Sequence, residues 1–498
     1  MKFKEKKRSL FAKILHSSFG VFTSRIFGLI RDLVIAALFG ASKYTDAFFV
    51  AFAIPNLFRA LFAEGALSSA FIPILAENRN KGVKYSNTYM TKIITYLFLI
   101  VGLLTFIIII FSKYFILLFL PGYATDKEMV IFASNILKIV MPYLLFISIS
   151  SIFAGFLNLL GSFFIPQSST ALLNISMIAG AYIGWIFDNN IYYLAYGVFV
   201  GGILQLLLLF VFSYIYGYRI QSNLKMSDNV KKTFLLIIPS IFGVGISQLN
   251  FTVGRIIASF LNEGSISYLY YANRLFQFPL GVFSVALSGV ALAELSKTDI
   301  IDTQSKQHNL IDKAFIAIIL IILPATIGLI LLSDEITRFI YQRNHFTALD
   351  AAQTASALIM YSAGLIFFSF VNLFTKVFHS RKDTKTPVKI AAISFICNVI
   401  FMLLFIKWFS HAGIALASSF AAGINAFLLY AYIRDYSFNF KNNLAIILKI
   451  VSASAIMATV VTILKHYSLN LLIVILISAM TYFLCLAVLK VNIRRVLK

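Results

Sequence analysis

Long apolar runs, separated by charged or helix-breaking residues, occupy most of the 498-residue chain. An α-helix needs about 20 mostly apolar residues to cross the hydrocarbon core of a bilayer. The runs are continuous and do not alternate apolar with polar residues, which excludes a closed β-barrel. We therefore predict an all-α polytopic membrane protein with about fourteen spans. The predicted spans are 12–39, 45–76, 88–112, 129–159, 164–187, 191–216, 233–261, 265–295, 314–333, 350–378, 386–407, 411–433, 443–464 and 468–489.

Composition favours a membrane protein over the classes that a basic chain otherwise suggests. Hydrophobic residues make up 60% of the chain and charged residues 12%, whereas a soluble domain has about 25% charged residues. The net charge of +23 would indicate a nucleic-acid partner in a soluble protein. In a membrane protein it indicates topology, because Lys and Arg collect in cytoplasmic loops. No nucleic-acid partner is expected, and two cysteines in apolar runs exclude a disulfide scaffold.

The basic residues also orient the predicted spans. With the N-terminus inside, 26 of the 42 lysines and arginines fall in cytoplasmic segments and seven fall on the opposite side. This bias predicts that both termini are cytoplasmic. The basic start, residues 1–8, is interpreted as an uncleaved cytoplasmic head on the first span, because charges interrupt the apolar run that follows.

Nine cations remain inside the predicted spans, and several near span ends are expected to extend to the headgroups. Four are harder to explain in this way, namely Arg25, Arg31, Arg59 and Arg274. Each costs about 2.5–3.5 kcal/mol at a helix centre. Nearby acids offset only part of this cost, at Asp32, Asp46 and Glu64. The arginines therefore predict a water-filled cavity, an anionic ligand or both.

Helix geometry argues against a single cluster that contains both Arg25 and Arg31 on a straight helix. Arg25 and Arg31 are six residues apart, which places them about 240° apart around an ideal helix. A bend at Gly28 would bring them together. Pro55 is expected to bend the second span just before Asn56. Such bends favour moving gates, but they also occur in ordinary helical bundles.

The eighth span begins with the hydroxyl-bearing segment 264–267 and continues through three tyrosines to Arg274. One interpretation is a helix cap followed by interfacial aromatic residues. The other is a polar wall with an anion site, because arginine binds phosphate with two parallel hydrogen bonds. No nucleotide-binding loop, metal-ligand motif or catalytic constellation accompanies it, so neither an enzyme nor a cofactor is expected.

Polar motifs recur in and beside these spans. They are Ser24-Arg25-Ile-Phe-Gly28-Leu-Ile-Arg31-Asp32, Thr45-Asp46, Pro55-Asn56-Leu-Phe-Arg59, Phe62-Ala-Glu64-Gly65, Pro121-Gly122, Leu173-Asn174, Gly264-Ser-Ile-Ser267 and Tyr271-Ala-Asn273-Arg274. These motifs resemble those of the MurJ (MviN) lipid II flippases, of the multidrug/oligosaccharidyl-lipid/polysaccharide (MOP) exporter superfamily. The resemblance covers essentially the whole chain and is densest over 20–80. Many members carry acids where this chain has Asn273 and Gln277, so the resemblance does not support an ion pair at Arg274.

The resemblance implies two six-helix lobes around a central cavity, over residues 1–218 and 219–435, and a C-terminal helix pair over 436–498 that forms a groove for the lipid tail. It implies that undecaprenyl-diphosphate-linked peptidoglycan precursor (lipid II) is moved from the inner to the outer leaflet of the inner membrane. Implied substrate-binding residues are Arg25, Arg31, Arg59, Arg274 and Ser267. Implied gating or ion-pair residues are Asp32, Asp46, Asn56 and Glu64.

Physical reasoning and the resemblance agree on alternating access, since desolvated arginines suit a diphosphate. Two alternatives stay open: another polysaccharide-lipid or multidrug exporter of the same superfamily, and a non-transporting scaffold for cell-wall synthesis. A cation exporter is expected to place acids, not arginines, in its cavity. Lipid II, membrane lipids and cell-wall synthases are the expected partners. The residues leave the driving force open among membrane potential, Na⁺ and H⁺.

Overall fold

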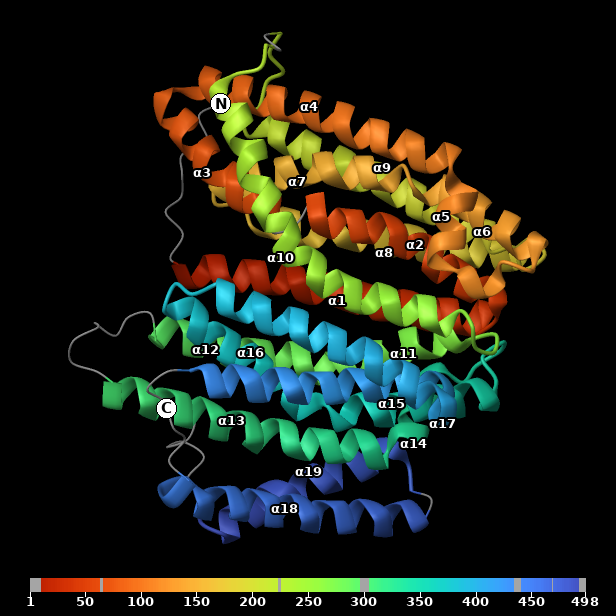
Figure 1. Cartoon of the computed structure of the whole chain (residues 1–498), viewed down its shortest axis with the longest axis vertical. Coiled ribbons are helices and arrows are strands. Elements are labelled where there is room, and N and C mark those ends of the chain that lie inside the picture. Colours follow the sequence, from red (N-terminus) through yellow and green to blue (C-terminus); the bar gives the residue numbers. More distant parts are fainter. Residues whose placement is uncertain are drawn as a thin grey trace. The chain divides into compact units, whose positions relative to one another are not determined.

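The computed structural model describes residues 10–62, 66–222, 225–295, 304–433, 440–467 and 469–491, and helices make up nearly all of them (Figure 1). No strand occurs within these ranges, so the predicted all-α fold class is confirmed. The chain divides into two compact units. Unit 1 comprises Met1–Gly264 with Arg343–Phe346, and unit 2 comprises Ser265–Gln342 with Thr347–Lys498.

Unit 1 is built around α8, which packs on both α1 and α9, while α2 packs on α6 and α10. The segment Arg343–Phe346 joins this unit, where the His345 N–H donates to the Ala37 carbonyl at 3.1 Å. Helix α10 packs on α2 and α3 inside unit 1, although the predicted lobes assign it to the second half. The two units therefore differ from the predicted lobes in where α10 belongs. The lobes, implied by the resemblance, remain a prediction. The helices are α1 Leu10–Phe39, α2 Lys43–Phe62, α3 Ala66–Lys81, α4 Val83–Ile110, α5 Ser112–Phe119, α6 Lys127–Val140, α7 Tyr143–Leu159, α8 Phe164–Ile186, α9 Tyr192–Ile215 and α10 Asp228–Ala258, with a 3₁₀ turn at Pro121–Tyr123.

In unit 2, α15 packs on α11 and α17, and α13 packs on α16 and α18. The last two helices, α18 and α19, pack on each other. A π-helical turn, Leu280–Ser284, separates α11 from α12. The helices are α11 Ser265–Pro279, α12 Val285–Leu295, α13 Gln304–Leu331, α14 Ser333–Tyr341, α15 Ala348–Ala363, α16 Leu365–Ser380, α17 Lys385–Tyr432, α18 Phe440–His466 and α19 Leu471–Val488.

Within the described ranges, nine helices are long and apolar enough to cross a membrane, and the pair α15 and α16, bent by 44°, adds a tenth. The 48 residues of α17 contain Ser410 in a non-helical conformation (φ 50°). This break falls between the predicted spans 386–407 and 411–433. Each of the fourteen predicted segments overlaps one or more helices, so the helices agree with a fourteen-span chain, whose exact span count stays a prediction.

Small residues let helices of unit 1 approach closely. A Cβ atom on Gly180 of α8 would lie 2.4 Å from the Tyr193 carbonyl oxygen of α9. A Cβ atom on Gly197 of α9 would lie 2.6 Å from the Ser176 carbonyl oxygen of α8. Because lipid tails are as apolar as the helices, packing of this kind is a main source of helix association in a bilayer. The α8–α9 pair is thus a rigid part of unit 1.

A proline inside α13 is compensated from α19. Pro324 has no N–H, so the carbonyl of Leu320, four residues earlier, has no donor within its own helix. The hydroxyl of Tyr482 on α19 donates to that carbonyl at 2.6 Å. In hydrocarbon an unsatisfied backbone group costs several kcal/mol. The last helix therefore completes the hydrogen bonding of α13.

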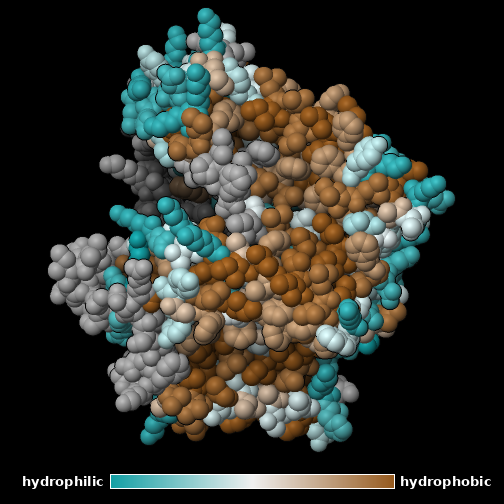
Figure 2. All heavy atoms as spheres, viewed as in Figure 1, coloured by the Kyte–Doolittle hydropathy of each residue, from teal (hydrophilic) through white to brown (hydrophobic). Residues whose placement is uncertain are grey.

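The surface agrees with a membrane environment. Between the helix ends of each unit the visible face is mainly hydrophobic, while hydrophilic residues gather at the ends (Figure 2). Large apolar side chains are exposed on many helices, among them Phe106 on α4, Leu235 on α10 and Leu484 on α19. Exposed apolar surface on this scale would be unfavourable in water. A bilayer provides the matching solvent.

Candidate functional site

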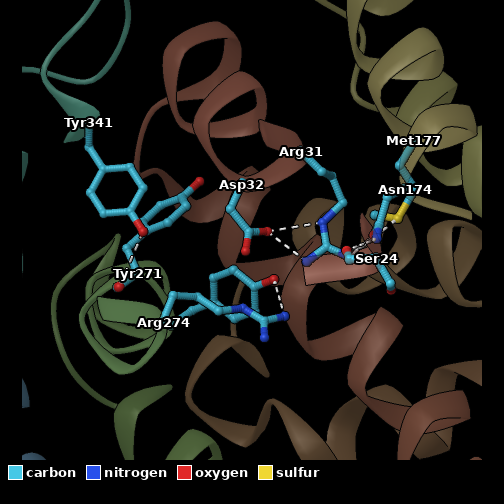
Figure 3. A network of polar contacts seen from close by, with 9 residues as sticks. Ser24, Arg31, Asp32, Asn174, Met177, Tyr271, Arg274 and Tyr341 are labelled. Carbon is cyan, nitrogen blue, oxygen red and sulfur yellow. Dashed lines mark hydrogen bonds and ion pairs between the residues drawn. The ribbon is translucent and has the colours of Figure 1, made fainter. Parts of the chain in front are cut away.

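Arg31 lies in a buried polar group on α1 and α8, here called the Arg31 group: Arg31, Asp32, Asn174 and Met177 (Figure 3). The guanidinium donates to Asp32 Oδ1 from Nε at 3.0 Å and from Nη2 at 2.7 Å. Its Nη1 donates to Asn174 Oδ1 at 2.9 Å and lies 3.9 Å from Met177 Sδ. Arg31 is 6% exposed and Asp32 2%. The protein thus neutralises this arginine with its own carboxylate.

The other two predicted arginines of unit 1 lie in different surroundings. Arg25, on the same helix as Arg31, is exposed. Arg59 on α2 is half-buried, and its Nε donates to Asn56 Oδ1 at 3.1 Å. Asn56 also donates to the Phe52 carbonyl one turn earlier, at 2.8 Å. Asn56 therefore fixes the Arg59 side chain to the backbone of α2.

Arg274, on α11 of unit 2, is exposed and rests on a tyrosine of the preceding turn. Its Nη2 donates to the Tyr270 hydroxyl at 3.1 Å (Figure 3), and its Cζ lies 5.1 Å from the centre of the Tyr270 ring. A cation over an aromatic face is attracted by the negative charge of that face. Ser267, one turn before Tyr270, is fully buried. Arg274 and Ser267 therefore differ sharply in accessibility, although both were predicted to contact substrate.

Asp46 lies in a second polar group of unit 1, here called the Asp46 group: Asp46, Tyr123 and Gly264. Asp46 Oδ2 accepts from the Gly264 N–H at 2.9 Å and from the Tyr123 hydroxyl at 3.4 Å. Burial, and secondly the charge of Asp46, raise the pKa of Tyr123, so its phenol stays a donor. Nearby, the Gly122 N–H donates to Ser259 Oγ at 3.0 Å. The Asp46 group holds the end of the segment after α10 against the turn after α5.

The structure brings some predicted residues together and leaves others apart. Arg31 pairs with Asp32, and Arg59 bonds Asn56. Asp46 meets Tyr123 and Gly264 in a different group. Glu64 lies outside the described residues. Within the described ranges, no three His, Cys, Asp or Glu side chains are arranged to hold a metal ion.

Residues that contact the predicted site but were absent from it include Asn174, Tyr270 and Tyr123. Asn174 carries a signal in the sequence, since an amide inside an apolar span needs partners that lipid does not supply. Tyr270 is one turn before Arg274, the spacing at which side chains on a helix meet. Tyr123 carries no such signal, because its contact with Asp46 links residues 77 positions apart.

Chemically, the guanidinium groups of Arg25, Arg59 and Arg274 suit an anion. Exposed guanidinium groups within apolar helices attract anions, and the paired Arg31 group is neutral unless its partners separate. Long apolar helices, broken spans and embedded arginines together define an integral membrane protein of the transporter class. Residues 35–483 match the family model described as "Lipid II flippase MurJ". The chain belongs to the MurJ family.

Relatives agree with this membership. A protein of Buchnera aphidicola subsp. Schizaphis graminum named "Probable lipid II flippase MurJ" is 37% identical over 424 residues, covering 83% of this chain and 81% of the relative. A solved structure described as lipid II flippase MurJ in an inward closed conformation has a TM-score of 0.84 at 30% identity, covering 97% and 100% of the two chains. An inward-facing multidrug resistance (MATE) transporter of the MOP superfamily shares the fold, with a TM-score of 0.64 at 12% identity, over 84% of this chain and 97% of that one.

Proposed function

We propose that this protein moves undecaprenyl-diphosphate-linked peptidoglycan precursor, lipid II, from the cytoplasmic to the outer leaflet of the bacterial inner membrane. Membership of the MurJ family supports the substrate class. The observation that carries the chemical part is the exposure of Arg25 and Arg274 on the helices α1 and α11. A diphosphate with about two negative charges offsets the cost of placing such cations in the bilayer. The protein acts as a transporter and performs no catalytic chemistry on the lipid.

The order of steps in the proposed transport cycle follows from the difference between the accessible arginines and the buried, paired Arg31. Arg25, Arg59 and Arg274 capture the diphosphate first, because exposed or half-buried guanidinium groups lose little on changing partners. Arg31 joins when its partner Asp32 is released, so the Arg31 group couples binding to movement of α1. Ser267 binds the substrate when α11 moves. The Asp46 group, with Asn56 and Glu64, gates access.

The lobes predicted from the sequence, 1–218 and 219–435, alternate between inward and outward openings around a central cavity, and 436–498 supplies the lipid-tail groove. Both termini are cytoplasmic, supported by the excess of basic residues on that side. Cell-wall synthases that use the outer-leaflet product are the proposed partners. Membrane potential influences the cycle, since moving one charge across 100 mV is worth about 2.3 kcal/mol.

The test is replacement of the cell's own flippase by this chain, with lipid II accessibility at the outer leaflet as the readout. The parent protein should restore outer-leaflet lipid II and growth, and R25A and R274A should fail at normal membrane abundance. Full activity of both variants would refute the arginine site. Growth rescue by a parent that moves no lipid II would favour the scaffold alternative, and export of a different lipid-linked glycan would favour the other exporter.

A further inference from the structure

Helix α8 is a fixed support on which α1 rests. Close glycine contacts join α8 to α9, and Gln205 Nε2 of α9 also donates to Ser169 Oγ of α8 at 3.2 Å, where both side chains are buried. A side chain that projects from α8 therefore has a defined position in unit 1. Asn174 is such a side chain, and it is 6% exposed.

One face of α1 lies along α8. A Cβ atom on Gly20 would lie 2.9 Å from Gln167 Cβ, and Ser24 Oγ lies 2.5 Å from Thr170 Oγ1. Gly28 and Arg31 continue this face, because positions three or four apart share one side of a helix. Arg25 lies off this face and is exposed. The rotation of α1 on α8 thus decides which arginine is accessible.

Asn174 contacts α1 on both sides of Gly28. Its Oδ1 accepts from Arg31 Nη1 at 2.9 Å, and its Nδ2 donates to the Ser24 backbone carbonyl at 3.2 Å. The amide orientation is dictated by its partners, since a guanidinium only donates and a carbonyl only accepts. Between the two bonds, a Cβ atom on Gly28 would lie 3.6 Å from Nδ2. A single amide thus bonds α1 on both sides of Gly28.

We propose that Asn174 is a positioning residue, here called the Asn174 clamp, which fixes the rotation of α1 on α8 so that Arg25 stays presented while Arg31 stays paired. The role of the clamp in transport rests on the proposed function, whereas the contacts of the clamp belong to unit 1 alone. Release of the Ser24 bond frees the first half of α1, and release of the Arg31 bond frees that guanidinium for substrate. The Asn174 side chain therefore links movement of α1 to the release of the Arg31 guanidinium.

Spin-label distances test the clamp without substrate. In a C397S/C485S background, labels at F22C on α1 and V211C on α9 report the position of α1, since both side chains are exposed. N174A should broaden or shift this distance distribution. N78A, which removes a buried amide of α3 that bonds its own helix and α10, is the matched control and should leave it as in the parent. N174D keeps an acceptor for Arg31 but loses the donor to Ser24, so it should broaden the distribution too.

Transport kinetics test the positioning role. In proteoliposomes with labelled lipid II, N174A should raise the apparent KM about tenfold, the size of one hydrogen bond to a charged group, and change the maximal rate less than about twofold. Parental distance distributions in N174A and N174D would overturn the clamp, and a broadened distribution with parental KM would overturn the positioning role. N174D preserves side-chain volume and carries the test if N174A does not fold. A parent that moves no lipid II would refute the proposed function, and the distances would still decide the clamp.

Discussion

Two arginines of this protein show opposite solutions to placing a cation among apolar helices. Arg31 in unit 1 is buried, with Asp32 and Asn174 on its donor atoms. Arg274 in unit 2 is exposed and rests on the Tyr270 ring. The first is neutralised by protein, and the second keeps its charge accessible. Identical side chains are therefore held in a buried ion pair in one unit and exposed on a tyrosine ring in the other.

The difference shows that burial and partners, rather than residue type, decide what a charge does. Removing one member of a buried pair leaves the other uncompensated, which destabilises the fold. Removing an exposed cation leaves the fold nearly intact and affects ligand binding. The contrast thus predicts separate losses of stability and of transport, and each can be measured.

The largest effect is expected for Asp32→Ala. The variant leaves the buried Arg31 guanidinium without its carboxylate and should lower the free energy of unfolding by about 3–5 kcal/mol. Thermal unfolding of the purified protein in detergent measures the change. The control is Asp334→Ala, which breaks the exposed pair of Arg338 Nε and Asp334 Oδ2, 2.6 Å apart, and should cost less than about 1 kcal/mol. Equal losses of unfolding free energy in the two variants would contradict the expected difference between the buried and the exposed ion pair.

Arg274→Ala should show the reverse pattern. Loss of a charge-assisted contact worth about 1.5–3 kcal/mol should reduce lipid II movement about 10- to 100-fold, while the unfolding temperature stays near that of the parent. Arg274→Lys should be intermediate, because it keeps the charge without the planar fork. Phe278→Ala, an exposed position on the same helix, is the control. A loss of stability comparable to that of Asp32→Ala would contradict the assignment.

Tyr270→Phe separates the contribution of the Tyr270 hydroxyl from that of its ring in holding Arg274. The variant removes the 3.1 Å hydrogen bond and keeps the ring beneath the guanidinium. We expect a transport rate two- to tenfold lower, from a net hydrogen-bond contribution of about 0.5–1.5 kcal/mol. Tyr270→Leu, which also removes the ring, should be slower than Tyr270→Phe. Equal rates for these two variants would show that the ring plays no part.

The smallest effect is expected outside the spans, at Asp383 before α17. The Thr386 hydroxyl at 2.6 Å, and then the Thr386 and Lys385 N–H groups at 3.0 Å, lower the pKa of this carboxyl. Its stabilising contribution is therefore present above the ordinary carboxyl pKa and is lost as the pH falls through the lowered value. Asp383→Asn should weaken this acid dependence only slightly, since the group is solvated. Unfolding temperatures across acidic pH measure it, and an unchanged profile would contradict the prediction.

Hydropathy was sufficient to predict most helices but not how they break. Each span needs about 20 apolar residues, a property that any window reveals. The segment 265–295 was expected as one span, and the structure places a π-helical turn at Leu280–Ser284 inside it. The predicted span 350–378 is bent at Gly364. These features depend on contacts between helices, such as the bond from Asn372 to Ser284 at 3.2 Å, and average hydropathy contains no information about such contacts.

The site was predictable as a set of residues but not as an arrangement. Arginines inside apolar runs stand out because they are costly there. The bond from Arg31 to Asn174 joins residues 143 positions apart, which no local pattern reveals. Asp32 was expected only as one of three nearby acids, whereas the helical angle of Arg25 predicted that the two arginines face different ways. That prediction agrees with the exposure of Arg25 and the burial of Arg31.

The bond from Tyr482 to the Leu320 carbonyl has a consequence for biosynthesis. A chain made from its N-terminus delivers α13 to the bilayer before α19 has been synthesised. Until then the Leu320 carbonyl, which lacks a helical donor because of Pro324, receives no hydrogen bond from α19. The hydrocarbon core of the bilayer supplies no donor either. Insertion of α19 satisfies it across 162 residues of sequence. Premature termination before Tyr482 would thus remove the α19 donor to this carbonyl from a helix already inserted.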